Sequence, residues 1–313
     1  MRTVVLLAHT GREDAVEVAV GFSRDLRREG VDVAIPAADE AVFAAAGLTD
    51  CVTFDGEPCE AELAVVFGGD GTILRAAETC RGTGIPVLGV NLGHVGFLAE
   101  ADAEDLADVV RGVVDRTYTV EERLTVDVQV TVGGEVVATN WALNEASVEK
   151  AARERMLELV VEIDDRPVSR WGCDGVVCAT PTGSTAYNFS AGGPIVWPEV
   201  SALLMVPISA HALFASPLVV SPSSKLAIEV VGETTTGVLW CDGRRAADLP
   251  FGARVEVVRG HEPVRLASLV PAPFADRLVR KFELPVDGWR GASARRRELE
   301  RRGRDDSRGR DDS

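Results

Sequence analysis

Short, mainly apolar segments recur through the first ninety residues of the chain. They cover residues 2–8, 31–35, 63–67 and 86–90. A strand that reads as a continuous apolar run is buried on both faces, as in a parallel sheet with helices on either side. Between and after these runs lie segments with helical apolar spacing, at 11–28, 73–80 and 103–114. The alternation predicts an N-terminal doubly wound α/β domain over residues 1–118, with ligands beyond the carboxyl ends of its strands.

From residue 119 the pattern changes to short strands. Residues 126–132 alternate between polar and apolar, turn at Gly133-Gly134 and resume at 135–138, which indicates a hairpin. Further strand candidates are separated by Gly, Pro or Asp and cover 157–163, 175–180, 225–231, 237–241 and 254–258. We therefore expect a mainly-β, sandwich-like C-terminal domain over 119–270, and a fold class of α/β plus all-β.

The C-terminal segment has two parts. Residues 274–281 have a helical pattern, and we expect 271–291 to return to the first domain. Residues 292–313 are rich in Arg, Glu and Asp, and the hexapeptide RGRDDS occurs at 302–307 and again at 308–313. Such a segment buries too little apolar surface to offset its ordering entropy, so we expect a disordered tail.

Composition excludes several classes of function. The chain has 33 Lys and Arg against 49 Asp and Glu, a net charge of −16, which argues against a nucleic-acid partner. The apolar run at 2–8 is one strand long, so we expect neither signal peptide nor membrane segment, and a cytoplasmic protein. The 6 cysteines form no CxxC pair and are expected to be free thiols rather than zinc ligands.

The sharpest motif is Gly68-Gly69-Asp70-Gly71-Thr72, between an apolar strand and a helix. Glycines allow a tight turn and a close approach of the backbone to a phosphate, and a helix N-terminus favours an anion. We expect a phosphate loop made of Gly68, Gly69, Gly71 and Thr72. Asp70 would repel phosphate, so it indicates a proton acceptor for an attacking hydroxyl or a group that engages a metal. The plainer alternative is a βα turn with Asp70 as the N-cap of the helix.

A second motif spans residues 173–194 and contains the segment Thr180-Pro181-Thr182-Gly183-Ser184-Thr185-Ala186-Tyr187. Glycines and small hydroxyl residues let the main chain approach a flat ligand and form hydrogen bonds with it. Tyr187 offers a ring face for stacking. Alone, this segment is also compatible with an ordinary β-loop.

Together these motifs resemble the bacterial NAD kinase family, and in their detail its actinobacterial members. The resemblance rests on GGDGTILRAAE at 68–78, NLGHVGFL at 91–98, LNE at 143–145 and DGVVCATPTGSTAYNFSAGGPI at 174–195. The actinobacterial character comes from AHALF at 210–214, CDGRR at 241–245 and DRLVRKF at 276–282. GGDGT alone also resembles the loop of diacylglycerol and sphingosine kinases and, less closely, that of phosphofructokinases, so the other motifs make the choice.

The resemblance implies an activity and a set of roles. The enzyme would transfer the γ-phosphoryl group of ATP, or a phosphoryl group of polyphosphate, to the adenosine-ribose 2′-hydroxyl of NAD, with Asp70 as general base and Mg²⁺ required. It would act as a homodimer or homotetramer, with Asp174 reaching into a neighbouring subunit's site. The residues implied to contact NAD are Asp70, Gly71, Arg75, Asn144, Glu145, Arg155, Asp174, Thr185, Ala186, Tyr187, Asn188, Phe189 and Ser190. The residues that hold the metal are not identified.

Plainer interpretations remain open for some of these residues. Arg75 is also placed for a surface salt bridge with Glu78, Asn144-Glu145 is compatible with a simple turn, and Arg155 lies in a charged, solvated stretch. His94 is expected to be structural.

The chain departs from the family at three positions. Gly172 and Ser216 stand where many members carry a basic residue, and Arg244 stands where Gln is frequent. Gly172 puts one basic contact to NAD in question.

Two competing functions follow from the same motifs. A lipid kinase would share GGDGT but is expected to show a membrane-facing apolar or basic surface. A module that senses NAD without turnover would gain nothing from Asp70.

Overall fold

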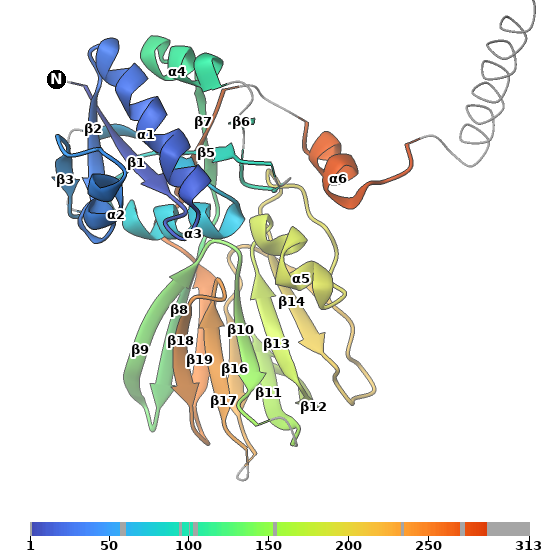
Figure 1. Ribbon diagram of the computed structural model, residues 1–313. Helices are drawn as coiled ribbons and strands as arrows, with labels where there is room; N and C mark the ends of the chain where they lie inside the picture. Colours follow the sequence, from blue (N-terminus) through green and yellow to red (C-terminus); the bar gives the residue numbers. More distant parts are fainter. Residues whose placement is uncertain are drawn as a thin grey trace, which may run out of the picture.

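The computed structural model describes residues 2–56, 61–93, 96–99, 101–102, 106–152, 155–232, 235–269 and 273–286. The predicted tail at 292–313 and residues 287–291 lie outside this range, as does His94. Within the described residues no helix is long and apolar enough to cross a membrane. Figure 1 shows the N-terminal sheet with its flanking helices above the two stacked β-sheets of the second half.

The N-terminal sheet contains the four predicted parallel strands, and a short fifth one, β3, that was not predicted; their order is β3-β2-β1-β4-β5. The apolar runs are buried on both faces because successive side chains point to opposite sides. Val4 and Leu6 pack in one core, whereas Val5 and Leu7 pack in the other. The strands are β1 (Thr3–Ala8), β2 (Asp32–Pro36), β3 (Val52–Phe54), β4 (Ala61–Phe67) and β5 (Val87–Asn91). The prediction of a parallel sheet is confirmed.

Helices cover both faces of this sheet. The core on the Val4 side takes residues from α1, α2 and α4, and the core on the Val5 side takes them from α3. The helices are α1 (Glu13–Arg28), the short η1 (Ala37–Asp39), α2 (Glu40–Ala45), α3 (Asp70–Thr79) and α4 (Leu106–Asp115). Leu143 and partly buried Trp141 also pack in the core beside α3, so the second half of the chain closes that face.

Two strands of the predicted mainly-β region belong to the N-terminal sheet. Strand β20 (Val264–Ser268) runs parallel to β5, and β7 (Thr119–Arg123) pairs with β20 in the antiparallel sense. Short β6 (Ala101–Asp102) also pairs with β5. The chain thus leaves the first sheet through β7 and returns through β20. The predicted domain boundaries at residues 119 and 270 stay a prediction. The strands' membership in the sheets favours a passage of the chain from one half to the other near residue 124 and back near residue 260.

The second half forms two antiparallel sheets of six strands each. One has the order β15-β14-β13-β10-β17-β18 and the other β12-β11-β16-β19-β8-β9. Both sheets contribute to a single apolar core that includes Trp171, Met205 and Leu239, which confirms the sandwich-like prediction. The strands are β8 (Val126–Val132), β9 (Glu135–Ala142), β10 (Glu145–Lys150), β11 (Leu157–Ile163), β12 (Arg166–Cys173), β13 (Gly175–Ala179), β14 (Leu203–Ile208), β15 (Leu218–Val220), β16 (Leu226–Val230), β17 (Gly237–Cys241), β18 (Arg245–Leu249) and β19 (Arg254–Arg259).

Three short helical segments lie outside these layers: η3 (Thr182–Thr185), α5 (Tyr187–Ser190) and α6 (Phe274–Phe282). Helix α6 contacts both halves of the molecule. Its Phe282 ring lies 5.7 Å from the ring of Phe97 and 4.7 Å from that of Phe189, measured between centroids. The C-terminal helix therefore bridges the segment after β5 and the segment around α5, at the side of the molecule in Figure 1.

Candidate active site

The predicted phosphate loop lies at the point where the strand order of the N-terminal sheet reverses. From β1 the chain proceeds outward to β2 and β3, and β4 then starts the other side of the sheet next to β1. The loops that follow β1 and β4 leave the sheet at adjacent carboxyl ends, which is where open α/β sheets bind ligands. A cavity of about 450 Å³ opens there, lined by His9, Thr10, Gly69, Gly71, Thr72, Arg75 and Arg244.

Glycine is needed at Gly68 for a different structural reason than at Gly69 and Gly71. A Cβ atom at Gly68 would lie 2.5 Å from Thr72 Oγ1, so a side chain does not fit there. Cβ atoms at Gly69 and Gly71 would meet nothing within 4 Å, because both positions face the open cavity. Helix α3 begins at Asp70, and the first N–H groups of a helix have no intrahelical acceptor. The loop therefore offers backbone donors and the positive end of a helix dipole to an anion.

Asp70 points away from this cavity. Its Oδ2 accepts the N–H of Phe97 and its Oδ1 that of Leu98, each at 3.1 Å. A side chain at Gly96 would overlap the carboxylate. The N-cap position belongs to Gly69, which makes no side-chain cap, so the interpretation of Asp70 as an N-cap is wrong. The loop presents its glycines to the cavity and its carboxylate to the segment after β5.

Arg75 lines the cavity, and its guanidinium group is bound by Asp39 and by the backbone of Ala8. Its Nη1 lies 2.8 Å from Asp39 Oδ1, and its Nη2 donates to the carbonyl oxygen of Ala8 at 2.5 Å. The alternative of a salt bridge with Glu78 is wrong. Glu78 instead accepts hydrogen bonds from Arg244 and Arg245 of the sandwich.

A second polar centre lies at the turn between β9 and β10. Asn144 and Glu145 are each 7% exposed, and among the described residues Asn144 Oδ1 and Glu145 Oε2 are buried without a hydrogen-bond partner. Burial, reinforced by the charge of Asp242, raises the pKa of Glu145 to about 8. Unpaired buried polar atoms are rare and call for a partner from outside the fold. The simple-turn interpretation of this pair does not account for them.

The Thr180–Tyr187 segment packs directly on this turn. Thr180 donates its N–H to Asn144 O at 2.9 Å and its hydroxyl to Leu143 O at 2.5 Å. A side chain at Gly183 would overlap the backbone of Asn144. Burial, with the charges of Glu149 and Glu145, raises the pKa of Tyr187. The structure thus brings residues 185–190 and Asn144-Glu145 together.

Within the 185–190 segment, Asn188 is fully buried. Its Nδ2 donates to Ser184 O at 3.2 Å and to Pro194 O at 3.1 Å. Its side chain therefore holds the loop in shape.

Asp174 and Arg155 lie elsewhere. Strand β10 pairs with β13 so that Glu145 lies opposite Ala179 and Glu149 opposite Gly175, at the other end. Asp174 therefore lies roughly 17 Å along the strands from Glu145, five residues at about 3.4 Å each. It is paired with Lys150 Nζ at 2.5 Å, and this interaction lowers the pKa of Asp174. Arg155 precedes β11 at that same end, since Leu157 pairs with Cys173.

At Gly172 and Ser216, two of the three positions that depart from the family pattern, the structure leaves space for a larger side chain. A Cβ atom at Gly172 would make only ordinary contact with Met156, at 3.6 and 3.8 Å, and Ser216 is exposed. The third, Arg244, lines the phosphate cavity, which sequence reasoning did not anticipate.

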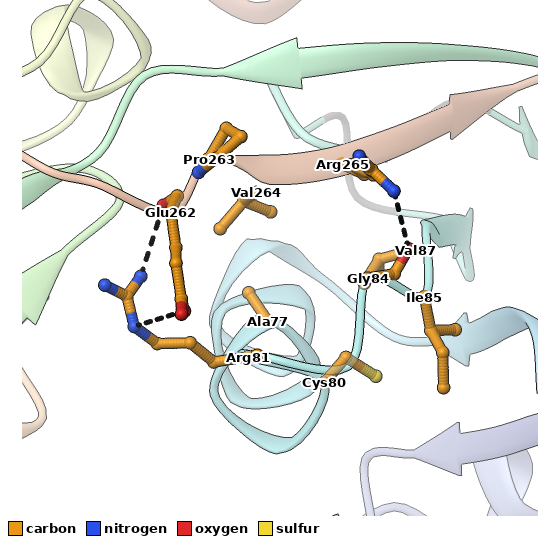
Figure 2. Close-up of a pocket in the computed structure, with 11 residues that line it drawn as sticks. Ala77, Cys80, Arg81, Gly84, Ile85, Val87, Glu262, Pro263, Val264 and Arg265 are labelled. Atoms are coloured by element: carbon orange, nitrogen blue, oxygen red, sulfur yellow. Dashed lines mark hydrogen bonds and ion pairs between the residues drawn. The ribbon is translucent and has the colours of Figure 1, made fainter. Parts of the chain in front are cut away.

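Another cavity, of about 200 Å³, lies at the amino ends of β5 and β20 (Figure 2). Each charged group that lines it already has a partner in the fold. Arg81 contacts Glu262, with 3.7 Å between Nε and Oε2, and Arg265 donates to Gly84 O at 3.3 Å. No predicted site residue lines it, so it is not the candidate active site.

Among the described residues, no group of three or more His, Cys, Asp or Glu is placed to hold a metal ion. A cation at the phosphate loop would therefore need ligands from a substrate.

Comparison with known proteins gives consistent matches along the chain. Residues 50–118 match the ATP-NAD kinase N-terminal domain, and residues 143–269 match the ATP-NAD kinase C-terminal domain. NAD kinase 2 of Streptomyces avermitilis is 60% identical over 299 residues, covering 93% of this chain and 97% of the relative. The NAD kinase of Thermobifida fusca is also 60% identical, over 94% of this chain and 93% of the relative.

Two solved structures are similar to this one. The yeast NADH kinase complexed with NADH has a TM-score of 0.83 at 24% identity, over 92% of this chain and 89% of the other, which supports the fold. An NAD kinase from Archaeoglobus fulgidus in complex with ATP has a TM-score of 0.67 at 25% identity, over 90% of this chain and 98% of the other.

Proposed function

The chain belongs to the NAD kinase family, and on this basis we propose that Asp70 takes the proton of the reacting hydroxyl while the glycine loop holds the phosphates of the donor. The overall reaction is transfer of the γ-phosphoryl group of ATP to the adenosine-ribose 2′-hydroxyl of NAD, giving NADP. The choice of NAD over a lipid acceptor follows from the full-length similarity to NAD kinases.

The role of Asp70 is supported by the way its carboxylate is held. Two backbone N–H groups, from Phe97 and Leu98, occupy one acceptor position on each oxygen and fix its orientation. Each oxygen retains a lone pair. A carboxylate that neither caps its helix nor faces the phosphate cavity is available to orient and deprotonate a hydroxyl. This is the observation that carries the proposal.

The donor's phosphates are proposed to lie on the glycine side of the loop, against Gly69, Gly71 and Arg75. The acceptor hydroxyl then approaches from the Asp70 side, and the γ-phosphoryl group passes between them in line. The N–H groups at the start of α3 stabilise charge that develops on the transferred group. The sequence left open whether the donor is ATP or inorganic polyphosphate, and the match to ATP-NAD kinase domains supports ATP.

We propose that NAD binds across the Asn144-Glu145 turn and residues 185–190, with Tyr187 stacking on it. The unpaired Asn144 Oδ1 and Glu145 Oε2 support this placement, because a ligand supplies their missing partners. A Glu145 carboxyl with a pKa of about 8 is protonated at pH 7 and donates a hydrogen bond. Asp174 and Arg155, far from this turn within one chain, are proposed to contact the NAD bound to a neighbouring copy in a homodimer or homotetramer.

A divalent cation, Mg²⁺, is proposed to accompany the donor. Because no group of His, Cys, Asp or Glu among the described residues is placed to hold the ion, phosphate oxygens of the donor would supply most of its ligands, the usual arrangement for Mg²⁺ at nucleotides. When bound, the ion neutralises charge on the phosphates.

The experiment is Asp70→Asn, with Asp108→Asn on the exposed surface of α4 as the matched control. An amide keeps the size but cannot accept the proton, so we expect kcat to fall by about 10²–10⁴-fold. The dissociation constant for NAD should change by less than about threefold. Turnover near that of the parent would contradict the role of Asp70.

A further inference from the structure

Arg244 is the one residue of the β-sandwich among the described residues that line the phosphate cavity. All the others come from the α/β layer system: the loop after β1, the glycine loop and α3. A cationic side chain that enters an anion cavity from the opposite half of the molecule is placed to contact a bound phosphate chain from its far side.

The turn that carries Arg244 is rigid. Between β17 and β18, Asp242 and Gly243 have φ values of +52° and +62°, the arrangement of a type I′ turn. The Asp242 carboxylate accepts the N–H of Leu143 at 3.0 Å and that of Asn144 at 2.7 Å. The turn is thereby fixed to the Asn144-Glu145 centre. The position of the Arg244 backbone therefore does not depend on its own side chain.

The hydrogen-bonding capacity of Arg244 is largely unused. Its Nε donates to Glu78 Oε2 at 3.1 Å, and among the described residues its two terminal nitrogens have no hydrogen-bond partner. Arg75, by contrast, uses both ends of its guanidinium group for Asp39 and Ala8. Of the two arginines at the cavity, Arg244 has the donors available for a bidentate contact with phosphate.

Glu78 does not depend on Arg244. Arg245 also donates to Glu78, through Nη1 to Oε1, and is itself held by Trp141 O at 2.7 Å and Asp242 Oδ2 at 2.9 Å. If Arg244 moves to a ligand, Glu78 keeps a cationic partner and is not left as an isolated charge. Movement of Arg244 from Glu78 to a ligand therefore costs little free energy.

We infer that Arg244 binds the phosphate chain of the donor, from the sandwich side of the cavity, and sets the affinity for the donor. The inference rests on the proposed function for the place of the donor phosphates. Arg245 is the structural arginine of the pair, and Arg244 is the binding one. Donor binding then connects the two halves of the molecule through the same turn that supports the NAD centre.

The first test compares Arg244→Gln and Arg244→Lys with the parent, with Arg111→Gln on the exposed face of α4 as control. Loss of a charge-assisted contact is expected to raise KM for ATP about 10- to 100-fold in Arg244→Gln, with KM for NAD changed less than about threefold. Arg244→Lys should lie between the parent and the Gln variant. A KM for ATP within twofold of the parent in Arg244→Gln, or a Lys variant no better than Gln, would overturn the inference.

Glu78→Gln separates binding from support of the fold. It removes the partner that Arg244 has in the structure but leaves its charge at the cavity. We expect KM for ATP to stay the same or to fall. A rise as large as that in Arg244→Gln would show that the salt bridge, rather than a phosphate contact, is what matters, and would overturn the inference.

Inhibition by tripolyphosphate, which has no nucleoside, locates the contact directly. In the parent it should compete with ATP, and in Arg244→Gln its inhibition constant should rise by the same factor as KM for ATP, while that of adenosine stays unchanged. No competition in the parent would contradict the proposed place of the donor. Competition that is equally strong in Arg244→Gln would contradict the role of Arg244 alone.

Discussion

At the scale of single residues, Glu145 shows how the site combines burial with an unmet hydrogen bond. Its Oε2 has no hydrogen-bond partner among the described residues. The shift of its pKa has two main causes, which are burial of the side chain and the charge of Asp242, itself buried. Both effects disfavour the charged form, so the pKa of Glu145 rises from 4.5 to about 8. In the unfolded chain the same carboxyl loses its proton near pH 4.5.

This difference predicts a pH-dependent stability. Between about pH 4.5 and 8 the folded chain keeps a proton that the unfolded chain has released, so the free energy of unfolding falls as pH rises through this window. The contribution is complete below pH 4.5 and lost above about 8. Urea unfolding of Glu145→Gln should show a smaller loss between pH 5 and 9 than the parent, by on the order of a few kcal/mol. Equal losses in the two proteins would contradict a raised pKa.

Sequence reasoning at the residue scale named candidate groups for the site but could not predict their contacts in the fold. GGDGT identified Asp70, and the resemblance identified Asn144 and Glu145. The N–H groups of Phe97 and Leu98 that hold Asp70 could not be predicted, because 27 and 28 residues separate them from it. The salt bridge of Arg75 with Asp39 was missed for the same reason, since helical spacing favoured Glu78.

At the scale of elements, α6 is linked to the glycine loop through Phe97. Arg277 Nη1 donates to Phe97 O at 3.1 Å, and the N–H of Phe97 is bound to Asp70. The rings of Phe274 and Phe282 pack on the Phe97 ring, with centroids 6.0 and 5.7 Å away. The helix that follows β20 therefore supports the segment that holds the Asp70 carboxylate.

This link predicts an effect of α6 on turnover. Arg277→Met removes one hydrogen bond to the segment, worth about 1 kcal/mol, and should lower kcat about fivefold. Arg277→Lys should restore part of the rate, and Arg28→Met at the end of α1 should have no effect. A change confined to thermal stability, with kcat unaltered, would show that α6 plays no part in orienting Asp70.

The continuous apolar runs of β1 and β4 and the alternating pattern of β8 predicted these strands without knowledge of their neighbours. Strands β10, β12 and β18 were missed because their sequences contain charged or small residues and are defined by cross-strand pairing. Strand β14 was also missed, although its residues are apolar and buried. The membership of β7 and β20 in the first sheet depends on partners far away in the chain, which local patterns do not specify.

At the scale of the whole molecule, polar contacts around Trp141 join the two halves. The guanidinium groups of Arg81 and Arg245 lie 4.0 and 4.6 Å from the centroid of its ring, and Arg245 adds the bond to Glu78 on α3. The net charge of −16 makes such local cationic groups valuable, because a substrate with several phosphates must bind to an acidic protein.

The two adjacent arginines should therefore behave differently in unfolding experiments. Arg245→Met removes contacts with Glu78, Trp141 and Asp242 and should lower the free energy of unfolding by about 2 kcal/mol or more. Arg244→Gln, with one partly exposed contact, should cost less than about 1 kcal/mol. Equal losses in urea unfolding would contradict the division of roles between them.

The central claim is that Asp70 accepts the proton in the phosphoryl-transfer step. Steady-state turnover includes product release, so the direct measurement is the single-turnover rate of NADP formation, with enzyme and ATP saturating over NAD. We expect Asp70→Asn to bind NAD as the parent does but to form NADP about 10²–10⁴-fold more slowly in this step. A single-turnover rate within about threefold of the parent would contradict it.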